Sequence, residues 1–166
     1  MEELAFGRTF TDHMLEVDWD TKTGWGAPRI VPYGDMAISP AATGLHYGIQ
    51  CFEGMKAYKD AKGNVRLFRP QMNMARLNKS MTRLAMPRID LNDSFLECIK
   101  ELVKLDANWI PDKDGYSMYL RPCAVGTAPY LGVHASEMVK LFCIASPVGP
   151  YYKNGFAPIR LLADTE

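Results

Sequence analysis

A tyrosine and an arginine stand two residues apart in the run Met118-Tyr-Leu-Arg-Pro122. Residues two apart in a β-strand point to the same face of a sheet, so Tyr119 and Arg121 share a face if this run is extended. A guanidinium supplies positive charge and paired N–H donors, and a phenol supplies a hydroxyl, so the two groups together suit the recognition of a carboxylate. An ordinary ion pair between neighbouring strands explains the same spacing equally well.

A second arginine, Arg76, ends the motif Asn73-Met-Ala-Arg76 and stands next to Leu77. Leu77 belongs to an apolar series at helical spacing, which places Arg76 at the edge of the buried stripe of a helix. An arginine at such an edge can direct its planar donor groups at a phosphate, or it can extend into solvent or pair with an acid. Spacing alone favours the solvent-exposed or salt-bridged arginine.

Two further segments combine aromatic or apolar residues with glycines. In Leu45–Tyr58, Tyr47 and Phe52 can wall a pocket, although aromatic residues beside a helix more often belong to the core. In Val125–Val133, two glycines and several apolar residues form a loop of the kind that reaches into a site or a partner, or that simply connects two strands.

The sequence predicts no metal site and contains none of the common nucleotide-binding or hydrolase motifs. The four cysteines are far apart and form no Cys-x-x-Cys pair, and the three histidines add no zinc-ligand spacing. The patterns Gly-x-Gly-x-x-Gly, Gly-x-Ser-x-Gly and His-Glu-x-x-His are absent, as is a Walker motif. We therefore expect free thiols in a reducing compartment, at Cys51, Cys98, Cys123 and Cys143.

Composition indicates a globular chain without a general affinity for nucleic acid. The 166 residues are 48% hydrophobic and 23% charged, which suits one domain or slightly more with its own core. The 19 basic residues balance the 19 acidic ones, whereas a nucleic-acid binder shows a basic excess. No apolar run is long enough to span a membrane, and the first residues match neither a signal nor a transit peptide. A cytoplasmic location is the default expectation, and a mitochondrial one requires that a targeting segment was removed.

The elements that must position these residues follow from turn formers and periodicity. Residues 1–44 contain many turn formers and predict short strands, and residues 45–53 predict a short helix. The runs Met55–Tyr58 and Val65–Phe68, joined through Gly63-Asn64, predict a β-hairpin.

Two helices and two longer strands are expected next. Pro70 suits the first turn of a helix that ends before the next proline. Ser94 with Glu97 forms a capping box that starts a second helix. Aromatic and β-branched residues predict strands at Tyr116–Val125 and Val139–Ser146.

The expected fold is α+β, a small domain of antiparallel strands with two main helices. We assign this domain to residues 1–146 and a turn-rich interdomain linker to residues 147–157. A new strand at Pro158–Ala163 is expected to begin a further domain within residues 158–166, because a strand needs partners to be stable.

Together, these segments resemble the branched-chain amino acid aminotransferases of fold type IV, which depend on pyridoxal 5′-phosphate (PLP). Each motif is weak alone, but the combination is specific and is most similar to the eukaryotic-type branch. The motifs run in order along nearly the whole chain and are Phe6–Leu15, Gly24–Ile30, Leu45–Tyr47, Phe52–Ala57, Val65–Pro70, Asn73–Arg76, Tyr119–Pro122, Leu131–Val133 and Pro147–Gly149.

The resemblance implies site residues, each carried over by its motif. Arg76 is implied to bind the cofactor by holding the PLP phosphate. The implied substrate-pocket residues are Phe6, Tyr47, Tyr119, Arg121 and Val133. Of these, Val133 is implied to reach the pocket of the other subunit in a homodimer.

The Schiff-base lysine of this family is expected beyond Glu166, so no catalytic residue is assigned within the chain. Lys153 in Tyr152-Lys-Asn-Gly155 imitates the lysine motif, but it lies in the linker and lacks the preceding strands of a large domain. Lys56 belongs to a motif that is expected on a strand. The chain as given is therefore expected to correspond to the amino-terminal small domain, to be inactive by itself, and to bind PLP weakly or not at all.

The resemblance implies a parent enzyme that transfers the amino group of leucine, isoleucine or valine to 2-oxoglutarate, giving glutamate and branched 2-oxo acids. Another fold type IV enzyme, such as a D-amino acid aminotransferase or an aminodeoxychorismate lyase, is the alternative within the fold. A natural non-catalytic module that dimerises or caps a full-length subunit is the alternative of a different class. No nucleic-acid, membrane or metal partner is expected.

Overall fold

The computed structural model describes residues 4–89, 94–152 and 157–164. Its strands are β1 (His13–Asp20), β2 (Gly24–Trp25), β3 (Arg29–Pro32), β4 (Gln50–Phe52), β5 (Met55–Lys59), β6 (Val65–Leu67), β7 (Ser117–Gly126) and β8 (Met138–Val148). Its helices are α1 (Thr43–Tyr47), α2 (Pro70–Arg83) and α3 (Ser94–Leu105), with a 3₁₀ turn η1 (Ala107–Trp109).

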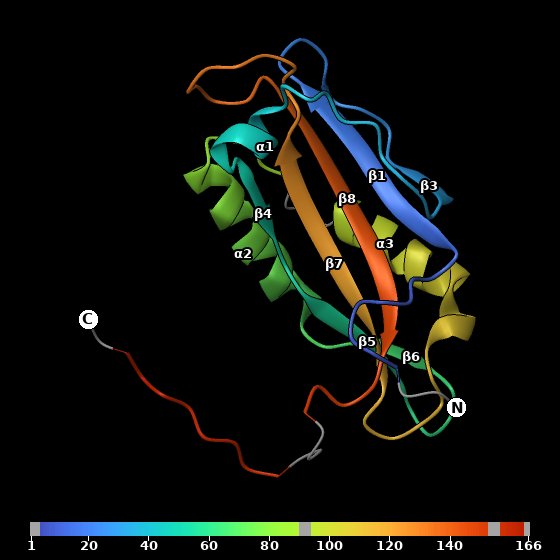
Figure 1. Cartoon of the computed structure of the whole chain (residues 1–166). Helices are drawn as coiled ribbons and strands as arrows, with labels where there is room; N and C mark the ends of the chain where they lie inside the picture. Colours follow the sequence, from blue (N-terminus) through green and yellow to red (C-terminus); the bar gives the residue numbers. More distant parts are fainter. Residues whose placement is uncertain (1–3, 90–93, 153–156, 165–166) are drawn as a thin grey trace.

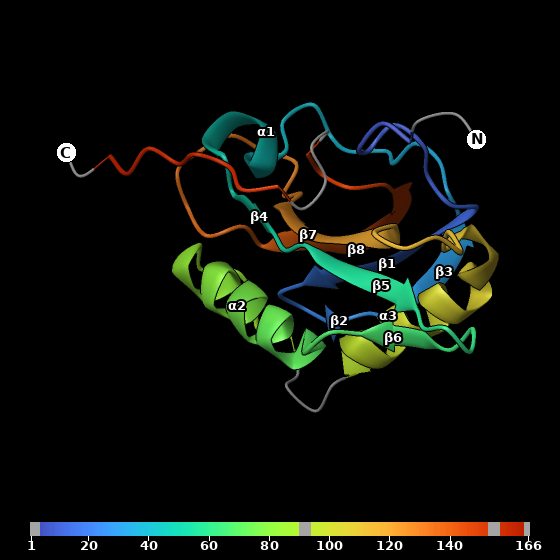
Figure 2. The same ribbon diagram turned by 90° about the horizontal axis from the view of Figure 1, so that it is seen from below.

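All the described strands belong to one antiparallel sheet, whose order is β2-β1-β8-β7-β5-β6, with β3 paired to β1 and β4 paired to β7 (Figure 1). The longer helices α2 and α3 cover one face of this sheet. Figure 2 shows that α1 and both ends of the chain lie on the opposite side. The sheet therefore has one face that packs on the helices and one that faces α1 and the chain ends.

Successive side chains of β7 alternate between these two faces. Met118 and Leu120 are fully buried toward the helices, whereas Tyr119 and Arg121 are only partly buried on the opposite face. The register pairs Tyr119 with Ser146 of β8 and Arg121 with Ile144. The expectation that Tyr119 and Arg121 share a face is thereby confirmed.

Helix α2 begins at Pro70, whose fixed φ and missing N–H suit the first helical position. Its apolar stripe of Met74, Leu77 and Met81 is buried against the core. This stripe leaves Arg76 on the exposed side of the helix, where it contacts Glu53 directly after β4. The predicted helix is confirmed, and it ends at Arg83, four residues before the proline.

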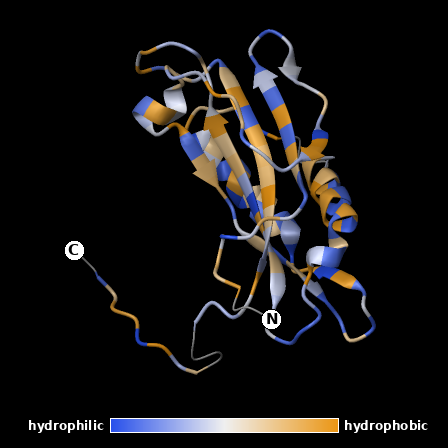
Figure 3. Cartoon of the chain, turned by 45° about the vertical axis from the view of Figure 1, so that its right-hand side comes forward, coloured by the Kyte–Doolittle hydropathy of each residue, from blue (hydrophilic) through white to orange (hydrophobic). Residues whose placement is uncertain are grey.

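Helix α3 has the more apolar face and supplies much of the core, with Leu96, Ile99 and Leu102 fully buried. Burying a side chain of this kind contributes about 1.5–3 kcal/mol relative to leaving it in water. Figure 3 shows apolar residues concentrated along β7 and β8 and alternating with polar ones along α3. The α+β fold with antiparallel strands and two main helices is therefore confirmed.

Several element bounds differ from the sequence prediction. The helix expected within residues 45–53 is α1, which ends at Gly48 in the left-handed conformation (φ 64°), and β4 takes up the following residues. Strand β8 continues two residues past its predicted end, because Pro147 and Val148 pair with Met118 and Ser117 of β7.

The strand expected at Pro158–Ala163 is not present. Residues 157–164 form no strand and are exposed, with Leu161 85% and Leu162 95% accessible. The segment has the apolar pattern of a strand, but a strand forms only when a neighbour supplies hydrogen bonds, and none of the described strands lies beside this segment. Within the described residues, no helix is both long and apolar enough to cross a membrane.

Candidate functional site

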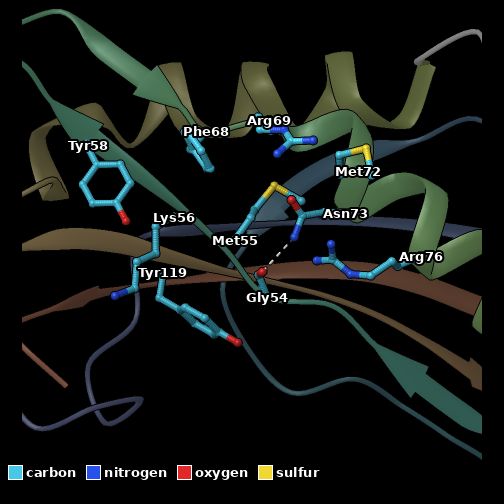
Figure 4. Close-up of a pocket in the computed structure, with 10 residues that line it drawn as sticks. All are labelled: Gly54, Met55, Lys56, Tyr58, Phe68, Arg69, Met72, Asn73, Arg76 and Tyr119. Carbon is cyan, nitrogen blue, oxygen red and sulfur yellow. Dashed lines mark hydrogen bonds between the residues drawn. The ribbon is translucent and has the colours of Figure 1, made fainter. Parts of the chain in front are cut away.

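A cavity of about 410 Å³ opens between the β5–β6 hairpin and the first turns of α2 (Figure 4). Three basic side chains and three aromatic ones contribute to its walls. Its lining residues are Gly54, Met55, Lys56, Tyr58, Phe68, Arg69, Met72, Asn73, Arg76 and Tyr119. A hollow with this lining suits a planar, anionic ligand better than a neutral aliphatic one.

Arg76 reaches this cavity from α2 and is paired with Glu53, which follows β4. The Nε of Arg76 donates to Oε1 of Glu53 at 2.8 Å, and Nη2 donates to Oε2 at 2.8 Å. These hydrogen bonds raise the pKa of Arg76 above its already high value. The salt-bridged arginine that spacing favoured is therefore present, and it lies on the wall of the cavity.

Glu53 is itself held in place by α2 and by β7. The buried Asn73 donates its Nδ2 to Oε2 of Glu53 at 3.0 Å and to the carbonyl of Gly54 at 2.9 Å. The backbone N–H of Glu53 donates to the carbonyl of Pro122 at 2.9 Å. The segment Glu53-Gly54 therefore connects α2 to the middle of β7.

A second group lies on the partly buried side of β7 and contains three of the predicted substrate residues. The Nε and Nη2 of Arg121 donate to the Tyr119 hydroxyl at 3.2 and 2.9 Å. The Arg121 guanidinium lies 4.1 Å from the centre of the Phe52 ring, in a cation–π contact. The Phe6 ring lies 5.0 Å from that of Tyr119. Phe6, Tyr119 and Arg121 are therefore in one cluster, and Tyr119 also lines the cavity that contains Arg76.

The other two predicted substrate residues, Tyr47 and Val133, form a separate group. The backbone N–H of Gly132 donates to the Tyr47 hydroxyl at 2.8 Å, so the loop between β7 and β8 is tied to α1. The adjacent Val133 is 91% exposed. Figure 1 shows α1 and this loop at the end of the sheet opposite to the β5–β6 hairpin.

Of the two lysines considered from the sequence, only Lys56 lies within the described residues. Lys56 lies on β5, on the strand expected for it, and it lines the cavity. Lys153 lies outside the described residues. Within the part of the chain that is described, no group of three or more His, Cys, Asp or Glu side chains is placed to hold a metal ion.

Sequence reasoning named Glu53, Gly54 and Asn73 only as letters of motifs and gave them no role. The available signal was a polar residue, Asn73, one turn before Arg76 on the same helix. Its burial indicates a specific partner, because a buried amide without hydrogen bonds is destabilising. The partner itself could not be found from spacing, since Glu53 is 20 residues earlier in the chain.

The four cysteine thiols are free, and burial raises the pKa of each of them: that of Cys51 to about 11, with those of Cys98, Cys123 and Cys143 also raised. Since the thiolate is the reactive form, we expect a disulfide reagent at pH 7.5 to label the folded chain far more slowly than the chain in denaturant. Cys143, which is fully buried, should be labelled last. Rapid labelling of Cys51 in the folded chain at pH 7.5 would contradict this expectation.

The donor set of the cavity fits a phosphorylated, planar cofactor such as PLP. The end of the Arg76 guanidinium that carries Nη1 makes no hydrogen bond within the described residues, so it is available to an anion. Lys56 and Arg69 add positive charge, and Tyr58, Phe68 and Tyr119 add flat apolar surface.

Comparison of the chain with known proteins gives consistent results in sequence and in structure, although no protein-family model matches it. It is 54% identical over 162 residues to the branched-chain-amino-acid aminotransferase of Monosiga brevicollis, covering 98% of this chain and 41% of the relative. It is 50% identical over 164 residues to the corresponding protein of Dictyostelium discoideum, covering 99% and 43%. It is 48% identical over 164 residues to branched-chain-amino-acid aminotransferase 2 of Bacillus subtilis, covering 99% and 45%.

Solved structures agree with this match. The branched-chain aminotransferase of Thermoproteus uzoniensis, crystallised with norvaline, superposes with a TM-score of 0.64 at 22% identity, covering 82% of this chain and 42% of that one. A second branched-chain amino acid aminotransferase, crystallised with pyridoxamine 5′-phosphate, gives a TM-score of 0.61 at 30% identity, covering 81% and 40%. The chain therefore spans about two fifths of the length of the relatives it matches, and it corresponds to their amino-terminal portion.

Proposed function

We propose that this chain is the amino-terminal part of a branched-chain-amino-acid aminotransferase of fold type IV, and that it forms the substrate-facing small domain of this PLP-dependent transaminase. The identities of 54% and 50% to two such relatives over nearly the whole chain support the proposal. The proposed reaction transfers the amino group of leucine, isoleucine or valine to 2-oxoglutarate, with glutamate and a branched 2-oxo acid as products. PLP supplies the electron sink for this chemistry. The residues of this chain bind and orient the cofactor and the substrate.

The observation that carries the proposal is the connection between Arg76 and the Tyr119–Arg121 pair through Glu53-Gly54. Arg76 is proposed to hold the PLP phosphate with the end of its guanidinium that Glu53 leaves free. Arg121, fixed by the Tyr119 hydroxyl, is proposed to attract the substrate carboxylate. One continuous segment thus sets a phosphate-binding group and a carboxylate-binding group at fixed positions relative to each other.

The remaining predicted residues are proposed to shape the space for the branched side chain. Phe6 packs on Tyr119 and supplies apolar surface beside the carboxylate-binding pair. Tyr47 holds the loop that exposes Val133, and this loop is proposed to reach the other subunit's pocket in a homodimer. Exposure of 91% at an apolar side chain is consistent with a contact made in the assembled enzyme.

We also propose that the connection to the rest of the protein, expected at residues 147–157, begins after β8 ends at Val148, and that residues 158–166 belong to the next domain. The exposed apolar residues Leu161 and Leu162 support this division, because they contribute nothing to the core described here. Relatives include both mitochondrial and cytosolic proteins, so either location suits the function.

A hybrid enzyme tests the proposed function. The 166 residues replace the matching segment of the Bacillus subtilis relative, to which they are 48% identical, and the product is assayed with leucine and 2-oxoglutarate by following glutamate. We expect turnover comparable to that of the unaltered relative, and none from the 166 residues alone. A folded, PLP-loaded hybrid that prefers D-alanine, or that releases pyruvate from aminodeoxychorismate instead, would favour the other fold type IV activities.

A further inference from the structure

We propose that Glu53 is a positioning residue for the cofactor: its carboxylate fixes one edge of the Arg76 guanidinium so that the opposite donors point at the phosphate. This inference rests on the proposed function, because it takes the ligand of Arg76 to be the phosphate of PLP. The Glu53 carboxylate would then act on PLP only through the Arg76 side chain.

The hydrogen bonds between Glu53 and Arg76 leave part of the guanidinium free. A guanidinium has five N–H donors in a rigid plane. Glu53 takes one donor from Nε and one from Nη2, at 2.8 Å each. Of the three remaining donors, one on Nη1 and one on Nη2 point in the same direction, so the pair leaves one ordered edge for a second anion.

Glu53 can position Arg76 only if the Glu53 side chain is less mobile than the Arg76 side chain. The Glu53 side chain is 11% exposed, whereas that of Arg76 is 56% exposed. By contrast, both partners of the helical pair Lys104–Glu101 are more than half exposed. Asn73 on α2 binds the Glu53 carboxylate, and the Pro122 carbonyl on β7 binds the Glu53 backbone N–H, so Arg76 is held against a fixed support.

The charges around the cavity decide the sign of the expected effect. A carboxylate close to a phosphate repels it, so Glu53 would weaken binding if it acted through its charge alone. However, Lys56, Arg69 and Arg76 all line the cavity, and both carboxylate oxygens of Glu53 are already engaged. Ordering Arg76 before the ligand arrives lowers the entropic cost of binding. We therefore expect the positioning effect to exceed the repulsion.

The central test compares PLP with pyridoxal, which lacks the phosphate, in titrations of the apo form of the hybrid enzyme followed by absorbance. In Glu53→Ala, the affinity for PLP should fall about ten-fold, the scale of one charge-assisted hydrogen bond, while the affinity for pyridoxal changes less than about two-fold. Glu53→Gln, which keeps one acceptor oxygen, should fall between the wild type and Glu53→Ala. In an Arg76→Ala background, Glu53→Ala should cause no further loss of PLP affinity, because Glu53 favours binding only through Arg76.

Several results would overturn the proposal. An equal loss for PLP and pyridoxal would show a general structural role, and tighter PLP binding in both Glu53 variants would show that repulsion dominates. A hybrid that transaminates leucine normally and is insensitive to Glu53→Ala would refute the positioning role and leave the proposed function intact. A phosphate-specific loss in a hybrid that does not act on leucine would refute only the function.

A measurement on the 166-residue chain itself does not depend on the hybrid. In a ¹⁵N spectrum of the arginine side chains, the Nε–H signal of Arg76 should exchange slowly with water and should weaken in Glu53→Ala. The signal of Arg66, whose Nε pairs with Asp60 at the β5–β6 hairpin, serves as the internal control and should not change. An Arg76 signal that is the same with and without Glu53 would show that the pair is not formed, and the proposal would fail.

Discussion

Replacing Arg121 with alanine in the hybrid enzyme should lower kcat/KM for leucine by about one to two orders of magnitude while leaving the affinity for PLP unchanged. A hydrogen-bonded charge pair between a guanidinium and a carboxylate is worth about 1.5–3 kcal/mol, which corresponds to roughly a ten- to hundred-fold change. Arg121 makes its hydrogen bonds to the Tyr119 hydroxyl, whereas Arg76 makes its hydrogen bonds to Glu53. The two arginines should therefore affect different ligands.

Inhibition by 4-methylvalerate isolates the carboxylate contact, because this molecule has a branched side chain and a carboxylate but no amino group. Its inhibition constant should rise in Arg121→Ala by about the same factor as kcat/KM falls. Arg83→Ala is the matched control, since Arg83 is exposed in the last turn of α2 and lines no part of the cavity. Loss of PLP affinity in Arg121→Ala, or equal loss in Arg83→Ala, would contradict the assigned role.

A companion variant tests how Arg121 is held. Tyr119→Phe removes the hydroxyl that accepts both hydrogen bonds but keeps the ring that packs on Phe6. We expect a smaller loss than in Arg121→Ala, because the Phe52 ring still supports the guanidinium at 4.1 Å. The difference between the two variants measures how much of the carboxylate recognition depends on the orientation of Arg121.

Local sequence patterns predicted the parts of this fold that local physics determines. The apolar series of α2 and the alternation of β7 each follow from one repeating environment, so helical and strand periods were sufficient to find them. The face shared by Tyr119 and Arg121 followed from the two-residue period of a strand. Local patterns were not sufficient where a strand needs a partner strand. Residues 158–163 have the apolar pattern of a strand but have no partner strand among the described residues.

The connections within the site could not be predicted because they join residues that are distant in the chain. Glu53 meets Arg76 across 23 residues, and its backbone meets Pro122 across the sheet. The resemblance implied Arg76 and Arg121 as separate site residues, but it gave no reason why their positions are coupled. The structure supplies that reason in the short segment Glu53-Gly54, whose first residue fixes Arg76 and whose second lies against Tyr119.

Gly54 gives the second large expected effect, because the chain passes so close to the Tyr119 ring that there is no room for a side chain. A β-carbon at Gly54 would overlap the Tyr119 hydroxyl and lie 2.9 Å from its Cζ and 3.0 Å from its Cε2. The backbone cannot easily move away, since Asn73 holds the Gly54 carbonyl at 2.9 Å. Phe6 packs on the Tyr119 ring, and Arg121 binds the Tyr119 hydroxyl. In Gly54→Ala the ring must therefore leave its position and release Arg121.

We expect Gly54→Ala to destabilise the 166-residue chain by about 1–3 kcal/mol, the usual cost of overpacking, which corresponds to a fall in Tm of roughly 2–12 °C at this size. In the hybrid enzyme, kcat/KM for leucine should fall at least as far as in Tyr119→Phe, because both the hydroxyl and the ring are displaced. Gly34→Ala is the matched control: no atom lies within 4 Å of the added carbon, so Tm and kcat/KM should stay unchanged. If Gly54→Ala behaves like Gly34→Ala in both measurements, Tyr119 is not held in the position that we assign to it, and the link between Arg76 and Arg121 does not pass through this segment.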